Sequence, residues 1–558
     1  MKKGLLVLVG ACFLIFTVCG GALGWQGRMD GMGDPVGLVG DESDFLVHPA
    51  KAAHGKGVKI YSHYGFKYTD VDWDWEADLD GGLVPAILGA LSLSYDLEND
   101  GDEWWHEALL GLTFPMGPGR MGVFFEFEGE YGDYGGHGVL TGGVGGLGSA
   151  TLDMKNDVDT DMNDFALRLV YGVPMGKVNL GMEAKLAYRE EENSWDSSLD
   201  SLSVTGAVLP TISIDSTNFP ITGLNRLLLP YDSDYWEFSF KTGVNWSIGS
   251  VEFDLTPRVG FIFGGDNSWD SDLTVDVGAV RRVFPGATAT NDFDMDGDVD
   301  GWNLGLDFWL RFPVTNDVSM PFLFRVDYRE KERDGSGDGM FDITIGGASI
   351  VGGGVPTTWD YEMEEETLEI TAGGGLDINV SKQTKIAFGL FYSYINSETN
   401  LETDLGINTP AGGINLITET DDGYPEYTEH QVRLEFAGEH AISSTFQLRG
   451  GLHLFYGWVD QEYDIDGGAN ILGAALPAVL NNTIELDGDH WGIDLSVGVS
   501  VMFDGFVVEP FINGGYHELS LDGDEEWNAL GAQLLTFDVD TERSEWFIGA
   551  GFSLLFNL

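Results

Sequence analysis

Apolar and polar residues alternate one by one along most of the chain from residue 57 onward. Between residues 178 and 189 the even positions are mostly Val, Leu, Met and Tyr, and the odd positions include Asn, Glu, Lys and Arg. The same alternation recurs at 123–131 and 322–329. Because successive side chains of an extended chain point to opposite faces, a period of two predicts β-strands with one apolar and one polar face.

Short turns and long connections follow each other strictly between these stretches. The short turns are rich in Gly, Pro, Asn and Ser and centre near residues 117, 175, 248, 315, 381, 442 and 504. With a first strand near 58–69 and a last one near 544–558, seven such hairpins give about sixteen strands. Stretches of about ten residues or more can cross a bilayer at a tilt. The pattern therefore predicts an all-β fold, a transmembrane antiparallel up-and-down β-barrel with short periplasmic turns and long extracellular loops.

Aromatic residues collect where the predicted strands meet the long connections. Trp residues open descending strands and Tyr residues close ascending ones, among them Trp104, Trp236, Trp302, Tyr131, Tyr188 and Tyr328. Amphipathic rings are enriched at both membrane interfaces. This favours a lipid-facing barrel in the outer membrane of a Gram-negative cell over a soluble β-sandwich.

The first 24 residues have the pattern of an export signal. Lys2 and Lys3 precede the apolar run 5–18, and the small residues Ala22 and Gly24 offer a cleavage site before Trp25. The chain has two cysteines, and both fall in this segment. We divide the rest into residues 25–56, which form either a plug in the lumen or a periplasmic tail, and a barrel over residues 57–558.

Acidic residues outnumber basic ones 91 to 28, giving a formal net charge of −63. Such a charge excludes nucleic acid as a partner, because phosphates need Lys and Arg, and it fits a surface that attracts cations. There are ten His and no nucleophile or nucleotide motif. We therefore expect no enzymatic activity.

Many charged residues occupy the polar, inward positions of the predicted strands. Opposed charges across a water-filled lumen would filter ions and small polar solutes, although they would equally serve to pair and neutralise each other. The predicted lumen residues are Glu126, Glu128, Glu130, Arg168, Glu183, Lys185, Arg189, Asp254, Arg258, Arg325, Asp327, Arg329, Arg433, Glu435 and Arg449.

One acidic segment resembles the front half of a calcium loop. Carboxylates stand at alternate positions around Gly297, namely Asp292, Asp294, Asp296, Asp298 and Asp300. An EF-hand would need a bidentate Glu where Asn303 stands, as well as flanking helices. The alternatives are a calcium-binding extracellular loop, which could also bridge to lipopolysaccharide phosphates, and a solvated acidic surface. No other cofactor is expected.

Two segments carry family resemblances. The last strand alternates from Trp546 to Phe556 and ends at Leu558, and it resembles the C-terminal signature that the outer-membrane barrel-assembly machinery binds. Gly31-Met-Gly-Asp-Pro35 and the segment 41–50, which ends in His48-Pro-Ala50, resemble the N-terminal hatch of FadL-type transporters of hydrophobic compounds. The family typically has Asn in place of His48. This resemblance implies a lumen plug and a barrel of fourteen strands instead of sixteen.

Three functions follow from these patterns. The first is a passive channel for small cationic or polar solutes, the second a FadL-like transporter of hydrophobic compounds, and the third a surface scaffold or adhesin anchored by the barrel. Outer-membrane lipid and lipopolysaccharide are expected partners in each case. A homotrimer is possible and is left open by the sequence.

Overall fold

The computed structural model describes residues 32, 44–54, 56–81, 91–144, 148–206, 212–215, 221–222, 231–276, 288–345, 348–349, 355–408, 415–471, 474–529 and 532–558. The predicted signal peptide and most of residues 25–43 lie outside the described residues. No described helix is both long enough and apolar enough to span a bilayer.

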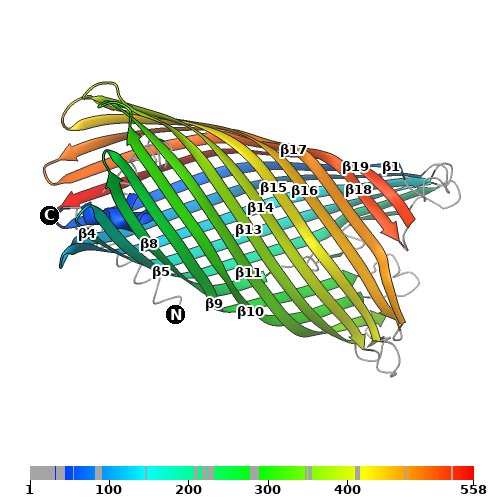
Figure 1. The fold of residues 1–558 in the computed structure, drawn as a ribbon. Helices are drawn as coiled ribbons and strands as arrows, with labels where there is room; N and C mark the ends of the chain where they lie inside the picture. Colours follow the sequence, from blue (N-terminus) through cyan, green and yellow to red (C-terminus); the bar gives the residue numbers. More distant parts are fainter. Residues whose placement is uncertain are drawn as a thin grey trace.

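Sixteen long antiparallel strands close into one barrel within the described residues (Figure 1). Each strand pairs with its neighbour along the chain, and β1 pairs with both β2 and β19, which removes every free edge. The predicted sixteen-stranded up-and-down barrel is therefore confirmed. The strands are β1 (Lys59–Gly81), β2 (Leu91–Met116), β3 (Gly119–Val144), β4 (Gly148–Met175), β5 (Val178–Gly206), β8 (Tyr231–Ile248), β9 (Val251–Asp276), β10 (Thr288–Pro313), β11 (Val318–Ile345), β13 (Val355–Asn379), β14 (Thr384–Asn408), β15 (Asn415–Ala441), β16 (Phe446–Ile471), β17 (Ala474–Phe503), β18 (Phe506–Ala529) and β19 (Ala532–Asn557), with short strands β6 (Ile212–Asp215), β7 (Ile221–Thr222) and β12 (Ala348–Ser349) at the far end.

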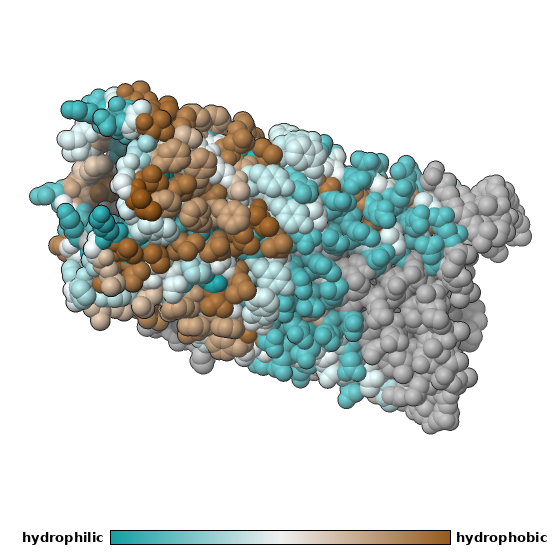
Figure 2. Space-filling view, in the orientation of Figure 1, coloured by the Kyte–Doolittle hydropathy of each residue, from teal (hydrophilic) through white to brown (hydrophobic). Residues whose placement is uncertain are grey.

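Exposed apolar residues form a belt on the half of the barrel that carries the short turns, and Figure 2 shows one face of it. Its residues are large, outward-facing and solvent-accessible in the isolated chain, for example Phe125, Leu390 and Ile548. A soluble protein does not expose a surface of this size, whereas a bilayer covers it. The chain is thus an outer-membrane β-barrel whose turn end is periplasmic.

Aromatic pairs border this belt on the side away from the turns. Trp302 on β10 lies 4.9 Å from Tyr328 on β11, measured between ring centroids, and Tyr188 on β5 lies 5.1 Å from Trp236 on β8. Tyr188 and Trp236 are direct cross-strand partners, and Trp302 lies diagonally across from Tyr328, whose direct partner is Leu304. Their position is that of an interfacial girdle.

The strands continue far beyond this girdle, which corrects the expectation of long extracellular loops. They contain 18 to 30 residues each, and β10 stays paired with β11 from Thr288 to Pro313. The acidic segments between the apolar stretches therefore belong to strands. The polar outward positions of these acidic segments favour loops when only the sequence is considered. A strand that extends beyond the membrane into water needs no apolar face, however, and its backbone still pairs with neighbouring strands of similar length.

Outward carboxylates of neighbouring extensions face each other directly and form what we call the acidic collar. Asp298 on β10 pairs with Asp334 on β11, which pairs with Glu362 on β13, and Asp522 on β18 pairs with Asp540 on β19. Figure 2 shows this polar zone next to the apolar belt. Like charges at directly opposed positions destabilise a sheet. The extensions consequently carry electrostatic strain that the belt does not.

Mild acidification should tighten the extensions. Burial and the neighbouring carboxylates raise the pKa of Glu332 on β11 and of Glu364 on β13 above the ordinary value. A carboxyl with a raised pKa in the folded state binds protons more readily there than in the unfolded state, so folding stability rises as the pH falls toward that pKa. We expect slower amide hydrogen exchange in residues 328–340 near pH 5 than near pH 7, with the belt segment 320–326 unchanged.

The variant Glu364→Gln should lose part of this pH dependence. Exchange that is equal at both pH values, after correction for the intrinsic chemical rate, would show that the collar carries no such strain.

Candidate functional site in the barrel lumen

An N-terminal segment lies inside the barrel near the short turns. It consists of helix α3 (Asp44–Val47) and the 3₁₀-helix η1 (Pro49–His54), and η1 contacts β3, β4, β5 and β8. Glycines make room for it on the wall, because a Cβ atom at Gly181 would clash with the backbone of Pro49 and Ala50. Of the two arrangements that the sequence left open for this region, residues 44–54 adopt the one inside the lumen.

Wall cations hold the segment through its backbone and side chains. Arg168 on β4 and Lys241 on β8 both donate to the carbonyl oxygen of Leu46, at 3.3 and 3.2 Å. Lys51 pairs with Asp44 at 2.9 Å and with Asp254 on β9 at 3.4 Å. Bonds that involve ionised groups are stronger than neutral ones, so these contacts fix the segment's position.

His48 connects the segment to the next two strands of the wall, β9 and β10. Its side chain is fully buried, and its Nδ1 atom lies 2.8 Å from Oγ1 of Thr256 on β9. Its ring meets Trp309 on β10 edge-on at 4.1 Å, and the Lys51 ammonium lies 4.6 Å from the same indole. His48 stands where the hatch resemblance expects Asn, and here the imidazole forms the polar contact with the wall.

Apolar contacts fasten the segment on two sides of the lumen. Phe45 packs against Tyr61 on β1 and Phe124 on β3, with ring centroids 5.8 and 5.5 Å away. Met32 is buried in a second cluster with Trp309 and with Phe391 on β14. Residues 32 and 44–54 together therefore reach both halves of the wall.

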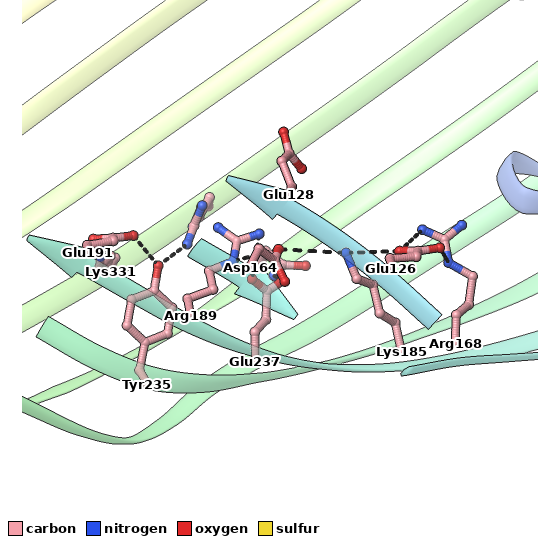
Figure 3. A network of polar contacts seen from close by, with 12 residues as sticks. Glu126, Glu128, Asp164, Arg168, Lys185, Arg189, Glu191, Tyr235, Glu237 and Lys331 are labelled. Carbon is pink, nitrogen blue, oxygen red and sulfur yellow. Dashed lines mark hydrogen bonds and ion pairs between the residues drawn. The ribbon is translucent and has the colours of Figure 1, made fainter. Parts of the chain in front are cut away.

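Ion pairs cover the wall above the segment (Figure 3). Arg168 lies 2.8 Å from Glu126, Lys185 lies 3.5 Å from the same carboxylate, and Arg189 lies 3.2 Å from Asp164. Acids and bases alternate on neighbouring strands, so most of these charges have a partner of opposite sign. This part of the lumen is charged but close to neutral.

A second contact crosses the lumen beyond the girdle. Glu191 on β5 pairs with Lys331 at 2.6 Å and with Arg333 at 2.8 Å, although β8, β9 and β10 lie between β5 and β11 on the wall. Tyr235 on β8 donates to Glu191 at 2.5 Å. Burial alone would raise the pKa of Glu191, but the two cations hold it at about 2. These ion pairs therefore hold β5 and β11 close together across the lumen at this level.

Another part of the wall in the outer half is apolar. Leu486 on β17, Leu521 on β18, and Phe537 and Val539 on β19 are buried against each other, together with Ala77 and Val459. We call these six residues the apolar lumen patch. Trp75 and Tyr95 pack against its border.

All fifteen predicted lumen residues lie on the lumen side of their strands. Beyond the pairs given above, Arg325 binds Asp307 at 2.7 Å, Arg433 binds Glu435 at 2.8 Å, and Arg258 binds Asp327. Glu183 lies 3.2 Å from Lys241, and Arg449 lies 2.8 Å from Glu509. Arg329 donates a hydrogen bond to Tyr235, and Glu128 accepts one from Trp105. The side chain of Glu130 is half-buried.

The sequence missed Lys331, Arg333 and Glu191, which complete this wall. Lys331 and Arg333 continue the inward series of Arg325, Asp327 and Arg329 at alternate positions. The alternation itself indicates them, but an aromatic girdle at Tyr328 favours a strand end, and β11 continues past it.

The expected calcium loop is wrong in its geometry. Residues 292–300 belong to β10, and Asp296, Asp298 and Asp300 project outward as part of the acidic collar. On an extended strand, alternate side chains stand about 6.6 Å apart in a row, so they do not wrap around one ion. The side chains of Asp292 and Asp294 lie outside the described residues.

One lumen trio resembles a hydrolase triad in composition. His63 lies between Ser553, 2.7 Å from its Nδ1 atom, and Glu107, 2.6 Å from its Nε2 atom. A serine nucleophile needs access to its substrate, and Ser553 is fully buried. The trio therefore ties β1 to β2 and β19.

Comparison with known proteins gives a likeness of fold. No protein-family model and no curated protein sequence matches the chain. Similar solved structures include a FadL homologue of Pseudomonas aeruginosa (11% identity, 96% of this chain and 98% of that one, TM-score 0.36) and the toluene transporter TodX of Pseudomonas putida (12%, 95% and 98%, 0.36). The toluene transporter TbuX of Ralstonia pickettii is a further example (10%, 94% and 97%, 0.32). Such values do not indicate a shared function.

A large side chain at Gly181 should expel the N-terminal segment from its seat. Gly181→Leu would drive a side chain into the backbone of Pro49 and Ala50 while leaving the paired strand intact. Because Lys51 is buried in the wild type, trypsin should cleave after it at least about tenfold faster in the variant. Protein in detergent and mass spectrometry of the peptides suffice for the measurement.

Gly438→Leu is the matched control, since a Cβ atom there meets nothing closer than 3.8 Å. Equal cleavage of all three proteins would mean that residues 44–54 are not seated on β5 in solution.

Proposed function

We propose that the chain is an outer-membrane transporter that admits small hydrophobic compounds through a gated lumen. The observation that carries this proposal is the combination of an apolar patch at the outer end of the lumen with a lodged segment at its periplasmic end. A passive polar pore needs neither feature.

The apolar lumen patch supports a hydrophobic solute. Leu486 and Val539 face the inside of a barrel in which water-facing walls are expected to be polar. Burying an apolar solute against such a wall gains roughly 25 cal/mol for each Å² removed from water. The patch would therefore take up a hydrophobic compound when its packed side chains separate to admit it.

The charge distribution gives the alternative cation channel no support. Most of the acids predicted at inward strand positions are paired there with bases, as Glu126 is with Arg168 and Lys185. The unpaired excess faces outward in the acidic collar. A solute in the mid-lumen would meet a nearly neutral wall.

The seated segment supplies the gate in this proposal. Residues 44–54 lie between the mid-lumen and the periplasmic turns, held by Arg168 and Lys241 at the carbonyl of Leu46. A solute that reaches this level would pass when the few contacts of the segment yield, while the strands stay paired. The gate is thus weaker than the wall around it.

Entry of an apolar dye across a lipopolysaccharide leaflet tests the proposal. Vesicles with lipopolysaccharide outside and phospholipid inside exclude N-phenyl-naphthylamine, and the wild-type protein should speed its entry. The double variant Leu486→Asp with Leu521→Asp places charge in the patch and should slow entry at least about tenfold. Fluorescence of the dye reports the rate.

Leu495→Asp is a poor control because it disturbs the lipid face, so Ser496→Asp on the lumen wall of the same strand serves instead. Dye entry no faster than in protein-free vesicles would overturn the proposal and would favour a surface scaffold anchored by the barrel. Stable conductance steps from the wild type in a planar bilayer would favour the passive channel.

A further inference from the structure

A groove interrupts the lipid-facing wall between β11 and β15. Its volume is about 800 Å³, and its lining consists of apolar side chains and glycines, with Phe322, Phe324, Phe388 and Phe436 among them. We call it the β13 groove, because its floor is the run Gly373–Gly375 of β13. Of these residues only Gly374 faces the lipid, next to Ala372 on the same face, and their small size leaves a trough between the aromatic rows of the neighbouring strands.

The groove lies in the periplasmic half of the apolar belt. It begins at Met320, close to the start of β11 at Val318, and ends well before the Tyr328 girdle. Figure 2 shows this side of the barrel with the apolar belt next to the turn end. A groove at this depth is open to components of the membrane and closed to water-soluble molecules.

A basic turn stands at the periplasmic mouth of the groove. β13 and β14, which carry its floor and one wall, are joined by a turn that contains Ser381 and Lys382. Lys382 is exposed and forms no ion pair with an acid among the described residues. The exposed side chains of Val380 and Ile386 continue the apolar surface from the groove toward this turn. The distance from Leu376 to the turn is about 13 Å along the strand.

We propose that the β13 groove binds one phospholipid of the periplasmic leaflet, with an acyl chain over Gly373–Gly375 and the phosphate at Lys382. The apolar lining matches the acyl chain, and the exposed Lys382 ammonium matches a phosphodiester. The site is independent of the solute that the lumen carries.

Charge argues against a second copy of the chain as the occupant. A two-fold axis normal to the membrane would bring groove onto groove, since such contacts use the same patch on both subunits. That would place the two Lys382 ammonium groups near each other. A phosphate removes this repulsion, whereas a second copy creates it.

Native mass spectrometry of protein extracted from membranes tests the site. The wild type should retain one phospholipid per chain in mild detergent. Ala372→Phe, which fills the groove between Phe324 and Tyr392, and Lys382→Glu, which reverses the charge at its mouth, should each lower the retained fraction at least about fivefold.

Matched controls exist on the far side of the barrel. Ala184→Phe changes an equivalent outward Ala between Leu169 and Phe240, and Lys177→Glu changes a turn lysine between β4 and β5. Both should retain lipid as the wild type does, and the heat-modifiable gel mobility of all four variants reports folding.

Retention of lipid by Ala372→Phe and Lys382→Glu at the wild-type level would overturn the proposal. So would a wild-type dimer that carries no lipid and that Ala372→Phe dissociates, because the occupant would then be a second copy.

Discussion

Backbone hydrogen bonding in a medium without water is the constraint on which this structure depends. Each unpaired amide or carbonyl group in the hydrocarbon core costs several kcal/mol, so a sheet in lipid cannot keep an edge. The seam between β1 and β19 meets this demand, with pairs running from Lys59 and Asn557 to Leu79 and Phe537. Every other feature is arranged on a cylinder that this pairing has already closed.

Closure separates two surfaces with opposite requirements. The outer wall is apolar at the membrane and acidic beyond it, where water can solvate carboxylates such as Asp298 and Asp334. The inner wall cannot rely on bulk water alone and holds its charges in pairs, as Arg449 and Glu509 illustrate with both side chains nearly buried. The large negative charge of the chain thus resides mainly outside, and net charge says little about the lumen.

The lumen is closed by elements of different strength. The wall has a continuous ladder of backbone bonds, whereas the segment at residues 44–54 is held by side-chain contacts of His48, Lys51 and Phe45 and by two bonds to Leu46. Beyond the girdle, Glu191 binds Lys331 and Arg333 across the interior. Motion is therefore expected first in the segment and the cross-lumen pairs, and last in the strands.

The sequence by itself determined the barrel, its strand number and the direction in which side chains point. Period two fixes the face of each residue within a strand, and the strict succession of turns fixes the count, so Arg168, Arg325 and Glu435 could be placed inward without coordinates. The same local rule failed at strand ends. An extension in water keeps its pairing whether or not its outer positions are apolar, and Asp296–Asp300 therefore entered β10 instead of a loop.

Only the tertiary structure decided which residues meet across the interior. Glu191 and Arg333 are 142 positions apart, and His48 and Thr256 are 208 apart. The alternation places Glu191, Arg333 and Thr256 on the inner face of a strand, and it says nothing about His48, which precedes the first strand. It contains no information on distances across the lumen. The same holds for the N-terminal segment, because its seat on Gly172, Gly181 and Gly243 exists only once β4, β5 and β8 lie side by side. Local periodicity sets the face of a side chain, and closure of the cylinder sets its partner.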